Sequence, residues 1–310
     1  MPNPKTNGQS SIILEPGMLW LSITQRTQHA LQCGALKSIE TEHEFVEHDG
    51  VQFLVRILAN LVRKEQIKQL QAQKQAVSNK EFNPFLPYET DLFVIDLSDT
   101  HLCLLNKFNV VDHHILMITR AFEAQDTWLT LNDFEALGVC LAEVDGMAFY
   151  NGGKIAGASQ RHKHLQLVPL PMTPMGARIP IEPLIESAQF NGGVGDNPEL
   201  PFKHAIARLD TIWRNTPQEI AEAMLEIYRT LLQAVGFHDP VGHYEGQQSH
   251  PYNLIATRQW MMIVPRSQES YHNISVNSLG FAGSLLVRNS EQMQLLKALG
   301  PMNLLKQVAL

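Results

Sequence analysis

The chain has 310 residues, 44% of them hydrophobic and 18% charged, and its formal net charge at pH 7 is −7. This length and composition are typical of a globular protein with a large core, and no apolar run approaches the roughly 20 residues that cross a bilayer. The acidic balance argues against non-specific binding to nucleic acid, which needs a basic field. We therefore expect no nucleic-acid partner and no membrane partner.

The N-terminal region is polar and contains proline and glycine, so residues 1–15 are expected to form a flexible tail without the apolar core of a signal peptide. Three cysteines follow, Cys33, Cys103 and Cys140, which are widely spaced and form no Cys-x-x-Cys pair. This usage is typical of reduced thiols, and it predicts a cytoplasmic protein.

Capping residues and apolar spacing predict three helices. The first follows a capping box at residues 130–133. The second begins after Thr216, carries a proline in its first turn and ends near Gly236. The third runs from about residue 291 to 299, where a Gly-Pro pair stops it and can start another helix.

Strands are expected at apolar or β-branched runs. These runs are residues 53–58, 92–97, 101–105, 114–119, 164–168, 254–257, 260–264 and 285–287. They lie between helices and close turns and do not alternate regularly with helices. This arrangement favours an α+β fold with a mainly antiparallel sheet over a doubly wound parallel fold.

Two segments between these elements have unusual compositions. Residues 64–80 are rich in Gln and Lys and predict an exposed helix or a loop, whereas residues 171–201 hold many prolines and predict a long irregular connection. The expected organisation is a tail at 1–15, an N-terminal half at 16–175, a connection at 176–201 and a C-terminal half at 202–310.

The strongest chemical signal begins with a loop of small residues at 151–160. Such loops let backbone amides approach a phosphate closely, although a plain turn has the same composition. In the strand that follows, alternate residues share a face, so His162, His164 and Gln166 point one way and Lys163 points the other. Three adjacent polar groups are costly to bury unless each is hydrogen-bonded, so we expect a pocket on that face.

Three interpretations of the two imidazoles remain open from these residues alone. A His-x-His strand can supply two zinc ligands, but no third ligand stands at a close spacing. A neutral imidazole nitrogen can attack a phosphoanhydride and hold the nucleotide until another acceptor takes it. The third interpretation is a buried polar cluster whose hydrogen bonds are satisfied within the protein.

The sequence His162-Lys-His-Leu-Gln166 resembles the His-x-His-x-Gln motif of the nucleotidyl-transferase branch of histidine-triad proteins. Residues 157–166 are similar to those of the diadenosine tetraphosphate (Ap4A) phosphorylases, also called ATP adenylyltransferases. Further similar stretches follow in the same order, at residues 83–87, 105–108, 114–120, 253–266 and 277–283. The resemblance implies a HIT-like fold, similar to the hexose-1-phosphate uridylyltransferases, with a duplicated antiparallel sheet and flanking helices.

The resemblance also implies a reversible reaction in which Ap4A and phosphate give ATP and ADP through an adenylylated histidine. It assigns the nucleophile to His164, with His162 and Gln166 as the other catalytic residues. Gln166 stands where hydrolytic relatives carry a third histidine, and a neutral amide is a poor base for activating water. We therefore expect an ATP adenylyltransferase that binds Ap4A, ATP, ADP and phosphate, and that acts as a monomer.

The resemblance places the other nucleotide-binding residues in separate segments. They are Lys64, Asn106, Lys107, Asn151, Gly157, Ala158, Ser159, Gln160, Asn277, Ser278, Leu279, Ser284 and Arg288. The phosphate groove is expected at 157–160, with Asn151 at its entrance, and the ribose contact at 106–107. The family carries Met and Lys where this chain has Ser284 and Arg288, so the contacts with the second nucleotide depart from the family pattern.

No covalent cofactor and no protein metal site is expected, because the sequence has no carboxylate cluster, and a Mg²⁺ or Mn²⁺ ion would be carried by the substrate phosphates. Two other functions compete with the phosphorylase. A hexose-phosphate uridylyltransferase typically has prolines where this chain has Lys163 and Leu165. A non-catalytic sensor of dinucleotide polyphosphates would not need the intact His164 and Gln166.

Overall fold

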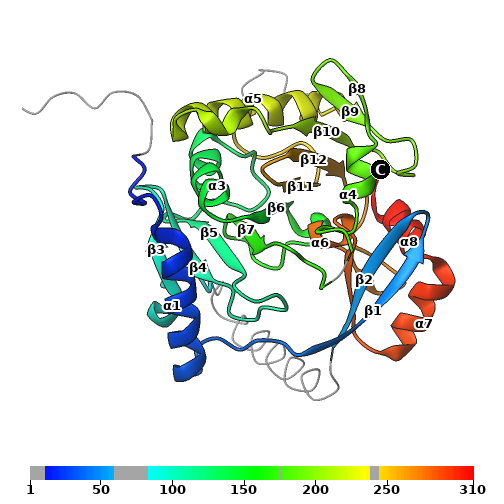
Figure 1. The fold of residues 1–310 in the computed structure, drawn as a ribbon, viewed down its shortest axis with the longest axis horizontal. Coiled ribbons are helices and arrows are strands. Elements are labelled where there is room, and N and C mark those ends of the chain that lie inside the picture. The colour runs from blue at the N-terminus through cyan, green and yellow to red at the C-terminus, as the bar shows by residue number, and fades with distance from the viewer. Residues whose placement is uncertain (1–10, 59–82, 175, 238–243) are drawn as a thin grey trace, which may run out of the picture.

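The computed structural model describes residues 11–58, 83–174, 176–237 and 244–310. It contains a ten-stranded sheet in which every neighbouring pair of strands is antiparallel (Figure 1). In spatial order the strands are β3 (Phe93–Asp96), β4 (His101–Leu105), β5 (Ile115–Thr119), β7 (His164–Pro169), β6 (Gly146–Gly152), β11 (Tyr252–Ala256), β12 (Trp260–Pro265), β10 (Ala205–Arg208), β9 (Val194–Asp196) and β8 (Gln189–Asn191). The predicted α+β class with an antiparallel sheet is confirmed.

A smaller sheet joins segments from opposite ends of the chain. It consists of β1 (Thr41–His48), β2 (Val51–Leu58) and β15 (Ser284–Val287), and β2 is antiparallel to β1 but parallel to β15. Val51, Phe53 and Val55 of β2 are buried in the core, whereas Arg56 on the opposite face is half-buried. The pairing of β2 with β15 holds the two halves of the chain together, as does the pairing of β6 with β11.

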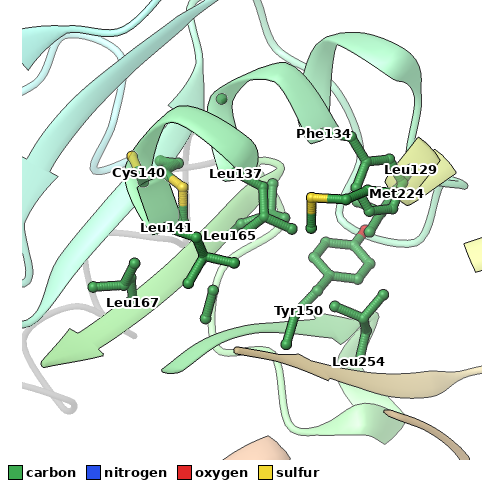
Figure 2. Packing of buried hydrophobic residues seen from close by; sticks show 14 of the residues in the cluster. Leu129, Phe134, Leu137, Cys140, Leu141, Tyr150, Leu165, Leu167, Met224 and Leu254 are labelled. Atoms are coloured by element: carbon green, nitrogen blue, oxygen red, sulfur yellow. The ribbon is translucent and has the colours of Figure 1, made fainter. Parts of the chain in front are cut away.

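Three helices contribute to a hydrophobic cluster with one face of the large sheet. They are α1 (Met18–Cys33), α3 (Leu131–Glu143) and α5 (Pro217–Ala234). Figure 2 shows Leu137 and Leu141 of α3 beside Leu165 of β7. Because side chains alternate along a strand, this packing directs His164 and Gln166 to the opposite face, as the sequence predicts.

The opposite face of the large sheet carries two further apolar clusters. One contains Phe149 and Ile255 together with β2, β15, α7 (Ser290–Leu299) and α8 (Pro301–Val308). The other, smaller cluster contains Phe85, Leu102 and Leu116. The polar residues of β7 therefore lie on the same face of the sheet as these two apolar clusters, and the clusters can form the walls of a pocket. None of the described helices is long and apolar enough to cross a membrane.

The helix starts predicted from capping residues are confirmed. The backbone N–H of Thr130 donates to Asp133 Oδ2 at 2.7 Å, and Thr216 Oγ1 accepts from the backbone N–H of Glu219 at 3.4 Å. The last predicted helix is α7, and α8 begins directly after Gly300. These local signals work because a capped helix end satisfies backbone N–H groups that have no partner within the helix.

Two expectations about loops are wrong. The segment 176–201 is not irregular, because it contains α4 (Glu182–Glu186) and the β8–β9 hairpin, and β9 pairs with β10 at the edge of the large sheet. The small-residue loop does not begin at Asn151, because this residue lies on β6 opposite Asn253 of β11. Prolines in the first segment and glycines in both are typical of loops. Their strands depend on hydrogen bonds to neighbouring strands, and composition alone does not reveal these bonds.

Part of the expected tail and of the Gln/Lys-rich segment cannot be compared. Residues 1–10 and 59–82, which include Lys64, lie outside the described residues. Within the expected tail, Ile12 forms a β-bridge with Ser98 and Leu14 is buried, so residues 11–15 are held against the large sheet.

Candidate active site

A cavity of about 380 Å³ is lined by residues from both sheets and from α6 (Ser278–Phe281). The residues from the expected site that line it are Asn106, Asn151, Gly157, Ser159, Gln166, Asn277, Leu279, Ser284 and Arg288. Those that do not line it are His162, His164, Lys107, Ala158, Gln160 and Ser278. The fold therefore brings most of the expected nucleotide-binding residues together from segments that are far apart in the sequence.

His164 is 4% exposed and its two ring nitrogens have different environments. Nδ1 lies 2.8 Å from the carbonyl oxygen of His162, which can only accept, so Nδ1 carries the proton. Nε2 then holds the lone pair. It has no hydrogen-bond partner among the described residues. Burial lowers the pKa of His164 to about 4, so the ring is neutral at pH 7.

A chain of hydrogen bonds sets the orientation of Gln166. Asn106 Oδ1 accepts from the backbone N–H of Phe108 at 3.4 Å, which directs Asn106 Nδ2 to donate to His114 Nδ1 at 3.2 Å. His114 Nε2 then donates to Gln166 Oε1 at 3.0 Å. Burial lowers the pKa of His114 to about 4, which keeps it neutral. The Nε2 amide group of Gln166 is thereby left as a donor in the cavity.

His114 is the residue that sequence reasoning missed, since it was predicted only as the start of a strand. It lines the cavity, whereas its neighbour His113 bonds to Thr27 through Nδ1 at 3.1 Å. The eight-residue spacing between Asn106 and His114 was a usable signal, because two strands joined by a short turn bring such positions together. Asn106 was expected to contact ribose, and its side-chain amide is instead engaged with His114 in this structure.

His162 has both ring nitrogens occupied by protein groups. Nε2 donates to the carbonyl oxygen of Thr119 at 2.8 Å, so Nδ1 is the acceptor and receives a hydrogen bond from Asn83 Nδ2 at 3.0 Å. The ring of Phe85 packs edge-on against both His162 and His164, at centroid distances of 5.6 and 5.4 Å. His162 is 1% exposed, and through its carbonyl group it fixes the tautomer of His164.

The loop after β6 packs closely against the start of α6. Gly157 has a φ of +92°, and a Cβ atom there would lie 2.8 Å from Asn277 Cβ and from the carbonyl oxygen of Val276, so only glycine fits. Asn151 Oδ1 accepts from the backbone N–H of Ser278 at 3.0 Å and from its Oγ at 2.8 Å. The side-chain oxygen of Asn151 thus joins β6 to the start of α6, and Ser278 is buried at this contact.

Two lysines that the sequence places in or beside the expected site form ion pairs with carboxylates. Lys107 forms an ion pair with Glu89. Lys163 is 1% exposed on the opposite face of β7, where its Nζ lies 2.8 Å from Asp133 Oδ2 and 3.2 Å from Glu123 Oε2. The strand alternation had predicted this orientation of Lys163.

A zinc site on the His-x-His strand would need a third ligand. Among the described residues, the group of His, Cys and carboxylate side chains within ligand distance of one another is His29, Cys33 and Asp91, which are exposed on α1 and on the short 3₁₀ helix Thr90–Leu92. That group does not include His162 or His164. Both ring nitrogens of His162 are bonded to protein groups in this arrangement, so neither is free to bind a metal ion.

Two family models together match most of the chain. The model of the Ap4A phosphorylase N-terminal domain matches residues 9–187, and that of the ATP adenylyltransferase C-terminal domain matches residues 198–310. Over 248 residues, 72% of this chain and 74% of the relative, the chain is 28% identical to diadenosine 5',5'''-P1,P4-tetraphosphate phosphorylase 2 of Saccharomyces cerevisiae. Over 289 residues, 87% of this chain and 86% of the relative, it is 26% identical to protein APA1 of the same yeast.

Solved structures show the same fold. The crystal structure of yeast Ap4A phosphorylase Apa2 in complex with Ap4A matches with a TM-score of 0.75 at 21% identity, covering 96% of this chain and 98% of that chain. The complex of Apa2 with AMP matches with a TM-score of 0.74 at 23% identity, covering 95% and 97%. At this level of identity the structural similarity establishes the architecture, and the two family models carry the assignment of the chain.

Proposed function

The chain belongs to the Ap4A phosphorylase (ATP adenylyltransferase) family, and we propose that its activity, the reversible phosphorolysis of Ap4A to ATP and ADP, proceeds through an adenylyl group on Nε2 of His164. The observation that carries this proposal is the tautomer of His164. A proton on Nδ1, held by the carbonyl of His162, leaves Nε2 with its lone pair and with no hydrogen-bond partner among the described residues. Burial keeps the ring neutral, which is the nucleophilic state.

The reaction divides into two displacements at the same phosphorus. In the first, Nε2 attacks the α-phosphorus, the bond from phosphorus to the bridging oxygen breaks, and ATP leaves with that electron pair. In the second, an oxygen of inorganic phosphate attacks, the P–N bond breaks, and Nε2 recovers its lone pair as ADP departs. Two displacements suit a site that must hold one nucleotide while the second ligand is exchanged.

Gln166 is proposed to hold the phosphoryl oxygens in both steps. Its Oε1 is occupied by His114, so its amide N–H groups are the donors that face the cavity. Preorganised donors stabilise charge that develops in the transition state without needing to reorient. A neutral amide cannot remove a proton from water, so the adenylyl group would survive until phosphate arrives.

Gln166→His is expected to raise the ratio of AMP to ADP formed from Ap4A and phosphate by about 10-fold or more, because an imidazole can act as a general base toward water. The ratio is measured by separating the nucleotides after a fixed time. Gln189→His, which is exposed on β8 and outside the cavity lining, is the matched control and should leave the ratio unchanged. An unchanged ratio in Gln166→His would refute the role given to the amide.

The pH dependence of adenylylation follows from the lowered pKa values of His164 and His114, both about 4. Protonation of Nε2 removes the nucleophile, so the rate with Ap4A alone should be constant between pH 8 and 5 and fall by half near pH 4. In the unfolded chain the two histidines have pKa values of 6.5, so they are protonated at a higher pH than in the folded protein. The free energy of unfolding therefore decreases as pH falls from 6.5 toward 4. A stopped-flow pH jump separates the two effects; half-loss of the rate near pH 6.5 would contradict the neutral, buried nucleophile.

The proposal also covers the groups that balance the substrate charge, the oligomeric state and the cellular location. We propose that two cationic side chains contact the substrate phosphates. They are Lys64, which lies outside the described residues, and Arg288, which lines the cavity. A Mg²⁺ or Mn²⁺ ion would be held mainly by the substrate phosphates, since transfer at phosphorus depends on charge stabilisation. We propose a monomer in the cytoplasm; the three unpaired cysteines agree with a reducing compartment.

The proposal is tested by mixing the protein with Ap4A and phosphate and resolving the products. ATP with ADP is the expected result. ATP with AMP would indicate a hydrolase, and binding of Ap4A without products would indicate a sensor. Uridylyl transfer between hexose phosphates, assayed in parallel, is expected to be undetectable.

A further inference from the structure

The small sheet presents two arginines to the cavity. In β2, Arg56 and Leu58 lie on the face opposite the core residues, and in the parallel register Arg56 stands beside Leu286 of β15. Arg288 follows two residues later and therefore points to the same side. All four of these side chains line the cavity that Gln166 also lines. Both arginines therefore line the cavity from neighbouring segments of the chain.

Neither guanidinium group has a protein partner in the part of the chain that the structure describes. Arg56 Nε is buried and makes no hydrogen bond, and burial lowers the pKa of Arg56 while the charge of Asp112 opposes this effect without forming an ion pair. Arg288 bonds to Gln292 only through its backbone N–H, at 2.8 Å. Glu269 is the acidic residue of the described cavity lining, and no ion pair joins it to either arginine.

Two other described arginines show what a paired guanidinium group looks like in this fold. Arg178 pairs with Asp145, and the buried Arg266 donates to Asn253 Oδ1 at 2.6 Å and to the carbonyl oxygen of Val308 at 3.0 Å. Burying a cation without a hydrogen-bonding partner is unfavourable. An arginine kept half-buried and unpaired in a nucleotide cavity is therefore a site that an anion would complete.

We propose that Arg56, together with Arg288, binds the phosphate oxygens of the group that leaves or attacks at the adenylyl phosphorus. This inference rests on the proposed function of His164. A guanidinium fork offers two parallel N–H groups, which match two oxygens of one phosphate. Two ligands supply such oxygens. They are the distal phosphates of Ap4A and the inorganic phosphate that replaces them, and both must lie on the side of the adenylyl phosphorus where the bond to the bridging oxygen breaks.

The test has one arm for each source and compares Arg56→Ala with the wild type. In the first arm, Ap4A is varied and the rate of adenylylation is followed without phosphate. In the second, the isolated adenylyl-enzyme is discharged by varied inorganic phosphate. Arg56→Ala should raise the half-saturating concentration in at least one arm by about 10- to 100-fold, with the maximal rate nearly unchanged. The arm that responds identifies the source.

Two variants serve as controls. Arg56→Lys keeps the charge but loses the fork, so it should recover part of the lost affinity. Arg178→Ala removes a surface guanidinium group whose partner is Asp145 and should leave both arms unchanged. Half-saturating concentrations within twofold of the wild type in both arms of Arg56→Ala would overturn the proposal, as would a lowered maximal rate with unchanged half-saturation.

A binding measurement keeps this inference separate from the proposed function. Calorimetric titration of Ap4A, and separately of inorganic phosphate, into His164→Ala and into His164→Ala/Arg56→Ala needs no covalent intermediate. A higher Kd in the double variant than in His164→Ala supports the role of Arg56 even if the wild type forms no adduct. Equal Kd values for both ligands would refute it even if His164 is the nucleophile.

Discussion

His164→Ala is expected to lower the rate of ATP and ADP formation from Ap4A by at least about 10⁴-fold, because removal of a nucleophile leaves only the binding and electrostatic contributions of the site. The adenylyl adduct, followed by intact-protein mass spectrometry, should be absent. The ring is buried, and the one hydrogen bond that it makes among the described residues is to the backbone carbonyl of His162, two residues earlier, so the variant should still fold with the wild-type circular dichroism spectrum.

Two other histidines give the matched comparison. His162→Ala loses the ring that bonds to Thr119 and Asn83 but keeps the backbone carbonyl that holds His164, so it should react slowly and still form some adduct. His113→Ala removes a ring that bonds to Thr27 and packs against Trp20 of α1, so it should react at nearly the wild-type rate. An adduct that persists in His164→Ala and vanishes in His162→Ala would mean that the two imidazoles have the opposite roles.

Lys163→Met is expected to lower the free energy of unfolding by about 3–5 kcal/mol, because it leaves the charge of Asp133 buried without its cation. Burial alone would raise the pKa of Asp133, but the charge of Lys163 and hydrogen bonds from His101 and Lys163 lower it well below its ordinary value. The stability that the pair contributes is therefore present at neutral pH and is lost only as pH falls below the carboxylate's ordinary range. Urea unfolding at pH 7 measures the effect.

The partners of Lys163 supply the controls. Glu123 is 46% exposed, so Glu123→Gln should change the free energy of unfolding by less than about 1 kcal/mol. Lys163→Met/Asp133→Leu should recover part of the loss, because it removes both charges, but not all of it, because Asp133 also bonds to the start of α3. A loss below about 1 kcal/mol in Lys163→Met would show that the buried pair contributes little.

The features predicted correctly from the sequence are those with short-range causes. The capping residues Thr130 and Thr216 mark helix starts because their partners are three residues away. The alternation along β7 separates His164 from Lys163 because the period of a strand is two residues. Helix α1 was missed because its N-cap residue, Gly17, has no side chain to cap the helix, so the usual start signal is absent.

The cavity could not be predicted because its walls meet through long-range pairing. Arg56 and Leu286 become neighbours only when β15 adds in parallel to β2, and nothing in either segment specifies that partner. Strand β1 was missed because its residues are mostly charged or polar and its two apolar residues, Phe45 and Val46, are adjacent, so the period-two alternation of a strand is absent. The role of His114 also depends on tertiary structure, since its orienting effect on Gln166 needs β5 and β7 side by side.

The most direct test is to map the adenylyl group after rapid quenching. Wild-type protein is mixed with Ap4A in the absence of phosphate, digested under conditions that preserve the P–N bond, and the labelled peptide is sequenced by mass spectrometry and examined by phosphorus NMR. We expect one AMP per chain on Nε2 of His164, which phosphate then converts to ADP. AMP on another side chain, or ADP formed at the normal rate with no labelled peptide, would contradict the account.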